Sequence, residues 1–248
     1  MTAQIDLNAD LGEGGRFDGA LMGVITSCNI ACGGHAGDVA TMRAALCVAK
    51  ENHVAAGAHP SFPDRETFGR APSTLSGSAL EEVLATQIQA LRDEADQLGI
   101  TLAHVKPHGA LYHMAEGDAG VSDSILNVLQ TTLPQAKLFG PPGSHLEACA
   151  RARGVGFVPE GFADRAYEAN GRLRARGKPG AVIQDRDAQA KQALDLAQAG
   201  CVTAYDGTTL PLTIRTICVH GDGADAFASA LAVRKALEDR GLELCAPA

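Results

Sequence analysis

Short apolar runs alternate with longer stretches of helical spacing along the whole of this 248-residue chain. Each run is followed by a cluster of glycine, proline, asparagine or aspartate, and then by apolar residues that recur every three or four positions. Apolar runs bounded by turn residues are typical of buried strands, and the wider spacing is typical of amphipathic helices. The alternation therefore predicts repeated βα units.

The predicted strands cover residues 4–8, 24–29, 54–58, 101–106, 137–139, 155–160, 201–204 and 216–220. The predicted helices cover residues 39–52, 76–98, 122–133, 145–153, 187–199 and 224–240, and Asp38 and Ser122 are plausible N-caps. Strand–helix alternation continues without a linker, an internal repeat or a change in composition. We therefore expect one α/β domain over residues 1–248, a length that suits a single large barrel.

Polar residues follow many of the predicted strands, in contrast to the single cluster expected of an open sheet. In chain order they are Asp10, His35, His59, His108, Glu160 and finally His220 with Asp222. An open parallel sheet concentrates its ligand groups at one crevice, whereas a barrel collects them from the carboxyl ends of many strands. The distribution favours a closed parallel barrel with a site at its carboxyl-terminal mouth.

Alternation within the strands predicts that the barrel interior is polar near this mouth. Asp6 and Asn8 share one face of the first strand, and His104 and Lys106 share a face in the same way. A lysine in an apolar strand is costly to bury without a counter-charge. We therefore expect Lys106 to meet a carboxylate or a substrate anion.

Loops rich in glycine and proline carry the first group of candidate site residues. Asp10 ends the segment DLNAD before a glycine-rich turn, and SCNIACGGHAGD presents Asn29 and His35 before a helix. Two prolines follow closely after His59 and stiffen its loop. The alternative interpretation is that Asp10 and Glu13 only cap the next segment and that His59 is an ordinary turn residue.

Three later segments supply the remaining candidates. The segment HVKPHGALY brings a lysine, a tyrosine and two histidines to one strand end. In the charged loop after residue 160, Arg165 can clasp a carboxylate through two parallel hydrogen bonds, while residues 172, 174 and 176 are interpreted as solvated arginines. Near the last strand, Asp222 can orient the imidazole of His220 and raise its basicity.

The candidates fall into two groups by the chemistry that their side chains offer. Residues predicted to be catalytic are Asp10, His35, His59, Lys106, His108, Glu160, His220 and Asp222, and residues predicted to bind substrate are Asn8, Asn29, Tyr112 and Arg165.

Charge and composition exclude several classes of protein. A net charge of −8, from 21 basic and 29 acidic residues with no long basic run, argues against nucleic acid as a partner. No signal peptide or apolar window of about 18 residues is present, so we expect a cytoplasmic protein without membrane spans. The seven cysteines lack a repeated spacing and are expected to be reduced thiols.

Neither GxxxxGK[ST] nor GxGxxG occurs, so any nucleotide is held in another way or by another chain.

The segments DLNADLGE, SCNIACGGHAGD, GAHPSFPD, VKPHGALY, EGFADRAY and ICVHGD, in this order and over nearly the whole chain, resemble the motifs of the LamB/YcsF family. The chain differs from the family pattern at Gly34, Val39 and Asn170, where Phe, Pro and Asp are usual. These differences leave the polar candidates in place and bear on loop shape and substrate preference.

The resemblance implies an irregular (β/α) barrel of about seven parallel strands, similar to deacetylase and glycoside-hydrolase barrels. It also implies an ATP-dependent opening of the lactam ring of 5-oxoproline to glutamate, carried out together with two partner subunits. ATP would be a co-substrate that activates the resonance-stabilised amide, and the missing phosphate loop suggests that the partners hold it at least in part. Self-association into a homo-oligomer is compatible with the sequence.

Two other functions stay open at this point. Aspartate and several histidines at a barrel mouth are also what a divalent metal requires, which would suit a metal-dependent amidase or deacetylase that acts alone. A third interpretation is a non-catalytic subunit that captures 5-oxoproline for its partners. Dependence on ATP, on metal and on the partners would separate the three.

Overall fold

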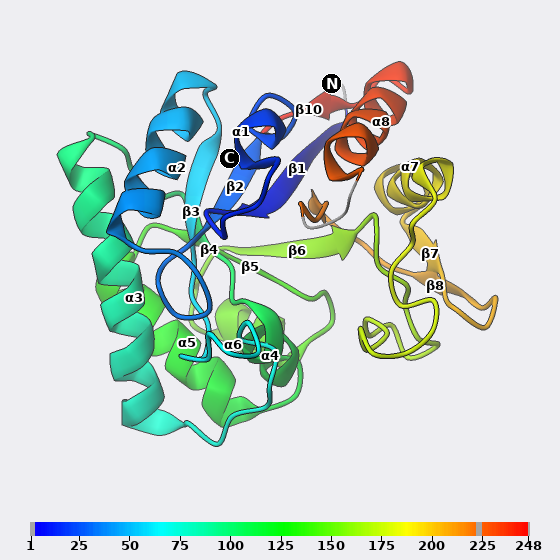
Figure 1. Ribbon diagram of the computed structural model, residues 1–248. Helices are drawn as coiled ribbons and strands as arrows, with labels where there is room; N and C mark the ends of the chain where they lie inside the picture. The colour runs from blue at the N-terminus through cyan, green and yellow to red at the C-terminus, as the bar shows by residue number, and fades with distance from the viewer. Residues whose placement is uncertain (1–2, 222–224, 248) are drawn as a thin grey trace.

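A closed barrel of parallel strands organises the computed structural model, which describes residues 3–221 and 225–247 (Figure 1). In spatial order the barrel strands are β1 (Gln4–Leu11), β2 (Ser27–Ala31), β3 (Ala55–His59), β4 (His104–Val105), β5 (Lys137–Gly140), β6 (Phe157–Phe162) and β9 (Thr216–Cys218). Pairing of β9 with β1 closes the ring. The predicted seven-stranded barrel is confirmed. A short β10 (Glu243–Leu244) pairs with the first residues of β1, ahead of its contact with β9.

Residues 201–204 were expected among the parallel strands, but they lie outside the barrel. Their strand β7 (Cys201–Thr203) forms an antiparallel pair with β8 (Thr209–Pro211), beyond β6 at the side of the molecule (Figure 1). Val202 is buried against Tyr167, Leu196 and Leu212 in a small separate cluster. The apolar run correctly indicated burial, but it contains no information on which strand it pairs with.

In the described part of the chain, six longer helices surround the barrel, and each overlaps a predicted one. They are α2 (Val39–Glu51), α3 (Gly77–Gln97), α5 (Ala119–Thr132), α6 (His145–Ala152), α7 (Arg186–Leu194) and α8 (Ala226–Asp239). A π-helical turn, Asp195–Ala199, continues α7. Asp38 caps α2 as expected, whereas α5 begins earlier than predicted because Asp118, and not Ser122, accepts a hydrogen bond from the first helical turn. No described helix is long and apolar enough to cross a membrane.

Two short helices, α1 (Asp18–Leu21) and α4 (Gly109–Ala115), were not predicted. In α4 most side chains are buried, including Leu111 and Tyr112 on neighbouring positions, so the segment has no polar face to give a helical period. The helix matters for the site because it directly follows His108 at the barrel mouth.

The two faces of β1 separate the apolar core from the polar interior. Ile5, Leu7 and Ala9 belong to the large apolar cluster shared with the helices. Asp6 and Asn8 lie on the other face, where Asp6 bonds Ser27 and Thr216 of the two adjacent strands. Asn8 reaches further and bonds Glu160 of β6. The alternation predicted from the sequence is confirmed. Each buried leucine or isoleucine on the outer face contributes about 1.5–3 kcal/mol to folding, which offsets the cost of the polar interior.

Gly57 of β3 lies against the imidazole of His104, and a Cβ at residue 57 would overlap the atoms of that ring. The ring cannot move away easily because it stacks on Phe139 on its other face and bonds Asn29. The interior at this level is therefore tightly packed.

We predict that Gly57→Ala lowers the free energy of unfolding by about 1–3 kcal/mol, the usual cost of overpacking a core. Urea denaturation at neutral pH measures it. Gly19→Ala is the matched control, because residue 19 lies in helix α1 with open space around it. Equal stability of the two variants would show that His104 adapts freely.

Candidate active site

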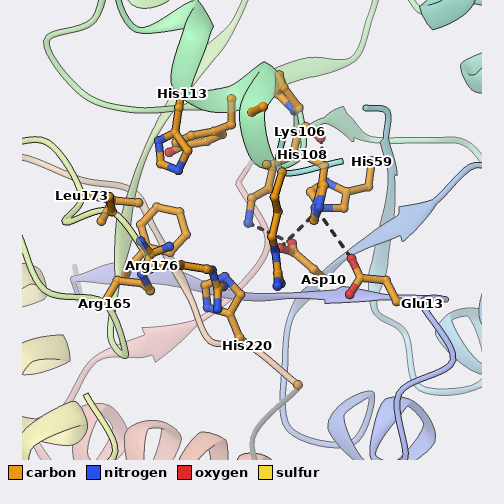
Figure 2. A pocket seen from close by; sticks show the side chains of 18 residues that line it. Asp10, Glu13, His59, Lys106, His108, His113, Arg165, Leu173, Arg176 and His220 are labelled. Carbon is orange, nitrogen blue, oxygen red and sulfur yellow. Dashed lines mark hydrogen bonds and ion pairs between the residues drawn. The ribbon is translucent and has the colours of Figure 1, made fainter. Parts of the chain in front are cut away.

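A cavity of about 220 Å³ opens at the carboxyl-terminal mouth of the barrel (Figure 2). Parallel strands end at the same side of a barrel, so residues far apart in sequence meet here. Its polar lining consists of Asp10, Glu13, His59, Arg70, Lys106, His108, Tyr112, His113, Arg165, Arg176 and His220. Pro107, Ala110, Phe162 and Leu173 are among the apolar residues of the wall.

Lys106 lies at the floor of the cavity, only 2% exposed, between two carboxylates. Its Nζ is 2.9 Å from Oδ1 of Asp10 and 2.8 Å from Oε1 of Glu160. Burial alone would lower the pKa of Lys106, but the two carboxylates raise it well above its ordinary value. Burial likewise favours neutral Asp10, yet His59 and Lys106 hold the pKa of Asp10 well below its ordinary value. Lys106 and Asp10 are therefore both charged at neutral pH, as the buried lysine led us to expect.

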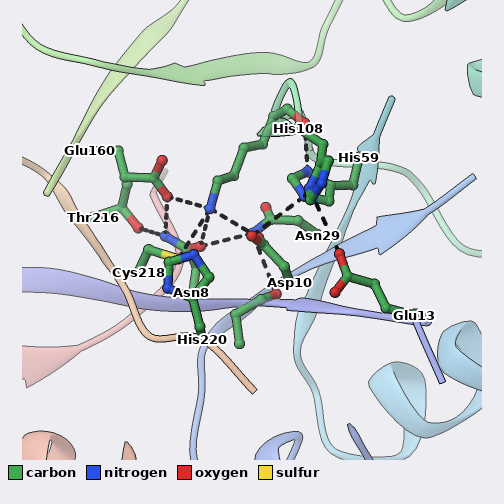
Figure 3. A network of polar contacts seen from close by, with 12 residues as sticks. Asn8, Asp10, Glu13, Asn29, His59, His108, Glu160, Thr216, Cys218 and His220 are labelled. Atoms are coloured by element: carbon green, nitrogen blue, oxygen red, sulfur yellow. Dashed lines mark hydrogen bonds and ion pairs between the residues drawn. The ribbon is translucent and has the colours of Figure 1, made fainter. Parts of the chain in front are cut away.

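Asn8 and Asn29 support this charged group from below and do not line the cavity (Figure 3). Asn8 donates to Oε1 of Glu160 at 3.0 Å, and Asn29 donates to Oδ1 of Asp10 at 2.8 Å. Their carbonyl oxygens are also occupied, that of Asn8 by Asn29 and that of Asn29 by His104. The amides predicted to bind substrate are thus fully engaged in holding Asp10 and Glu160 in place.

Three histidines and Glu13 form a second group beside Asp10. His108 Nδ1 is 2.9 Å from His59 Nε2, and His35 Nε2 is 3.0 Å from Oε1 of Glu13. The rings of His35 and His108 stack with centroids 3.7 Å apart. Burial, followed by the neighbouring histidines, lowers the pKa of His108, so it is neutral at pH 7. Glu13 was not among the predicted site residues, although it belongs to the acidic segment that ends the first strand, and a capping role was the alternative interpretation for it.

His220 is oriented by Asp164, a residue that sequence reasoning left out of the site. The Asp164 carboxylate accepts a hydrogen bond from the backbone N–H of His220 at 3.1 Å and lies 2.8 Å from Nδ1 of the same residue. Burial alone would raise the pKa of Asp164, but His220 outweighs burial and lowers it. Asp222, the predicted partner, lies outside the described residues. The ring nitrogen Nδ1 therefore carries the proton in neutral His220, and Nε2 is basic.

Two arginines line the same wall, but not as the sequence suggested. Arg165 is buried and already donates to the carbonyl oxygens of Ala181 and Arg174. Burial, and then the nearby Arg176, lowers the pKa of Arg165 to about 10, which leaves it charged at neutral pH. Arg176 was expected on a solvated face, whereas it lines the cavity. An anionic group of a ligand would meet positive charge on this side.

Three buried side-chain atoms of the described residues lack a hydrogen-bond partner, and all three belong to this region. They are Nδ1 of His35, the hydroxyl of Tyr112 and Oε2 of Glu160. Buried polar atoms are nearly always paired in folded proteins, so unpaired ones indicate a strained or a ligand-binding region. Tyr112 lines the cavity with part of its side chain, and burial, followed by the nearby Glu160, raises the pKa of its hydroxyl well above the ordinary value.

The predicted site residues therefore lie in three places. Lining the cavity are Asp10, His59, Lys106, His108, Tyr112, Arg165 and His220; directly behind the lining are Asn8, Asn29, His35 and Glu160; outside the described residues is Asp222.

A closed seven-stranded parallel barrel with a charged, histidine-rich mouth defines an α/β-barrel protein of TIM-like architecture. The chain belongs to the LamB/YcsF family, whose sequence profile matches residues 5–248. It is 44% identical to the A subunit of 5-oxoprolinase from Methylococcus capsulatus (strain Bath), over 99% of this chain and 96% of that protein.

One solved structure agrees with this assignment, and a more distant one shares only the fold. The crystal structure of a lactam utilization protein from Thermus thermophilus superposes with a TM-score of 0.91 and 37% identity, over 98% of this chain and all of that one. A family 4 carbohydrate esterase from Streptomyces lividans shares the fold alone, with a TM-score of 0.55 and 12% identity over 98% of this chain and 91% of that chain.

We predict that Lys106→Met lowers the free energy of unfolding by about 3–5 kcal/mol at pH 7, because the variant leaves buried carboxylates unpaired. The pKa of Asp10 is lowered in the folded protein, so its stabilising contribution is present above its ordinary value of 3.8 and is lost as the pH falls through the folded value. The difference in the free energy of unfolding between the variant and the wild type should therefore become smaller in acid. Urea denaturation at several pH values measures this.

Lys235→Met is the matched control, because Lys235 makes an exposed ion pair with Asp239 within helix α8. A Lys106→Met variant as stable as this control at pH 7 would contradict the charged assignment of Lys106 and Asp10.

Proposed function

We propose that this chain is the A subunit of an ATP-dependent 5-oxoprolinase and carries the site at which the lactam is opened to glutamate. The observation that carries the proposal is the 44% identity, over almost the full length of both chains, to a protein of that name. The similarity to a lactam utilization protein supports the same class of substrate. The geometry of the cavity supports it independently.

5-Oxoproline combines a carboxylate with a cyclic amide, and the cavity has a matching region for each. Arg165 and Arg176 provide positive charge on one wall, suited to the carboxylate. Lys106 and Tyr112 line the part of the cavity where the amide would lie. A small cavity whose polar groups are held in fixed positions is typical of a site for a small molecule.

The residues of the cavity support hydrolysis of an activated lactam. Once ATP has phosphorylated the carbonyl oxygen, water adds to the ring carbon, the ring nitrogen leaves with a proton, and a second water releases phosphate. His220, oriented by Asp164, is the proposed general base for the first water, because its Nε2 is basic. Lys106 stabilises the negative charge that develops on the carbonyl oxygen when the second water attacks the acyl phosphate, in a water-poor site.

ATP and the two partner subunits belong to this proposal as the source of activation. The sequence contains no recognisable phosphate-binding loop, which supports nucleotide binding at least partly on the partners. The relative from Methylococcus capsulatus is named as one lettered component of its enzyme, which also supports a complex of several chains.

The deciding experiment is glutamate formation from 5-oxoproline by this chain mixed with the two partner subunits. We expect product only when ATP and all three proteins are present, with ADP and phosphate formed in proportion. Glutamate produced by this chain alone without ATP would refute the proposal. Absence of product from the complete mixture, with each protein folded, would refute it as well.

We predict that Asp164→Asn lowers kcat by about 10²- to 10⁴-fold with little change in KM, because the variant no longer holds His220 in the basic tautomer. The assay is the ATP-dependent reaction of the full complex. Asp187→Asn, an exposed change in the first turn of α7, is the matched control and should keep wild-type kcat. A parallel rise in KM without loss of kcat would assign Asp164 to substrate binding.

A second candidate function is a metal-dependent amidase that acts without partners. The group of Glu13 and three histidines favours it, because these ligand types suit a divalent transition metal. Such an enzyme would be inactivated by chelators and would not require ATP. A non-catalytic capture protein, the third possibility, would bind 5-oxoproline while Asp164→Asn left kcat of the complex unchanged.

A further inference from the structure

We propose that Glu13, His59 and His108 bind a divalent transition-metal ion at the barrel mouth, with His35 orienting the glutamate. This inference goes beyond the proposed function, since lactam opening by the complex does not by itself require a metal. The candidate ligand atoms of these four residues all lie within 4.8 Å of one another. Figure 3 shows Glu13 joined to the histidine pair beside Asp10.

The hydrogen bonds of the two histidines fix which ring nitrogens carry protons. His59 Nδ1 lies 2.7 Å from the carbonyl oxygen of Lys106, and His108 Nε2 lies 2.9 Å from that of Phe68. A carbonyl oxygen only accepts hydrogen bonds, so both of these nitrogens carry a proton. In the neutral rings the other nitrogens, Nε2 of His59 and Nδ1 of His108, are therefore unprotonated.

When both rings are neutral, these two nitrogens carry no proton, and they lie 2.9 Å apart. Two lone pairs at that distance repel unless a cation or a shared proton lies between them. Nitrogen ligands bind zinc at about 2.0–2.1 Å, so two of them on one ion stand roughly 3 Å apart. The observed separation matches a pair of ligands that share one ion.

Glu13 supplies the negative ligand on the same side. Its Oε1 lies 3.8 Å from Nδ1 of His108, and it accepts a hydrogen bond from Nε2 of His35 at 3.0 Å. Two imidazoles with one carboxylate and an open position form a ligand set typical of catalytic zinc. Metal-binding histidines commonly donate their second N–H to a backbone carbonyl, and ligating carboxylates are themselves hydrogen-bonded. Both features are present here.

The loop that carries Phe68 is held in an unusual conformation at this point. Phe68 has a φ of 59°, which is rare and strained for a bulky residue. Its carbonyl bonds His108, and its ring packs edge-on against His35 and His108. The loop therefore fixes the orientation of one proposed ligand and screens the group from solvent.

Another group of possible ligands, Asp10, Cys218 and His220, lies nearby and suits a metal less well. The Nζ of Lys106 is 2.9 Å from Asp10 and 3.1 Å from Sγ of Cys218. A lysine that is already charged occupies the position of a cation there and would repel a second one. The histidine group lies at the other carboxylate oxygen of Asp10, 3.4 Å from Nε2 of His59, so the ion belongs on that side.

The test is zinc binding to the full-length purified chain, freed of metal, by titration calorimetry and by elemental analysis after dialysis. We expect one zinc per wild-type chain. The affinity for zinc should fall by more than about 100-fold in His59→Ala and in His108→Ala. Loss of a residue that only hydrogen-bonds a metal ligand usually costs less than this. Glu13→Gln, which keeps the shape of the side chain, should also weaken binding and guards against variants that fail to fold.

The matched control is His145→Asn, because the exposed His145 lies 3.1 Å from Cys149 and is the competing place for a surface-bound zinc. This variant should bind zinc as wild type does. Zinc retained by folded Glu13→Gln and His59→Ala but lost from His145→Asn would overturn the proposal. So would a wild-type chain that binds no zinc and whose histidine ¹⁵N spectrum shows one proton shared by His59 and His108. Neither readout depends on lactam activity or on ATP, so failure here leaves the proposed function intact.

Discussion

The ion pair between Lys106 and Asp10 is the interaction on which the rest of the site depends. Both groups are buried, and in such a place an unpaired charge is strongly destabilising or is lost by a change in protonation. Each keeps the other ionised, and Glu160, Asn8 and Asn29 supply the further polar contacts that make the arrangement tolerable. A folded barrel with apolar residues on its outer face provides the stability that allows such an interior.

Much of this arrangement could be predicted from the sequence, because it follows from strand period and strand order. Alternation along residues 4–8 placed Asp6 and Asn8 inside, and the cost of burying an amine predicted an anionic neighbour for Lys106. A parallel barrel then required that residues following different strands meet at one mouth. These inferences use only local pattern and the direction of the strands, which is why they agree with the structure.

The remaining site residues lie in loops, and the pattern of apolar and polar residues does not predict the path of a loop. Asp164 and Arg176 lie in the long segment after β6. Nothing in its composition separates an arginine that lines the cavity from the exposed Arg172, or from Arg174, which was predicted to be solvated but is mostly buried and pairs with Glu168. Glu13 follows a glycine turn whose path decides whether it caps a helix or faces His35. The same limit explains β7, since an apolar run reports burial but not the identity of its partner.

Asp10 connects the two halves of the mouth, because its two carboxylate oxygens serve different groups. Oδ1 accepts from Lys106 at 2.9 Å, while Oδ2 lies 3.4 Å from Nε2 of His59. A change of charge among the histidines is therefore felt by the lysine through one intervening carboxylate, in an interior where electrostatic interactions are poorly screened. A cation bound beside His59 would draw on the Asp10 charge, so that Glu160 would supply more of the counter-charge of Lys106. The Asp10 carboxylate thus couples the charge of the histidine group to the charge balance around Lys106.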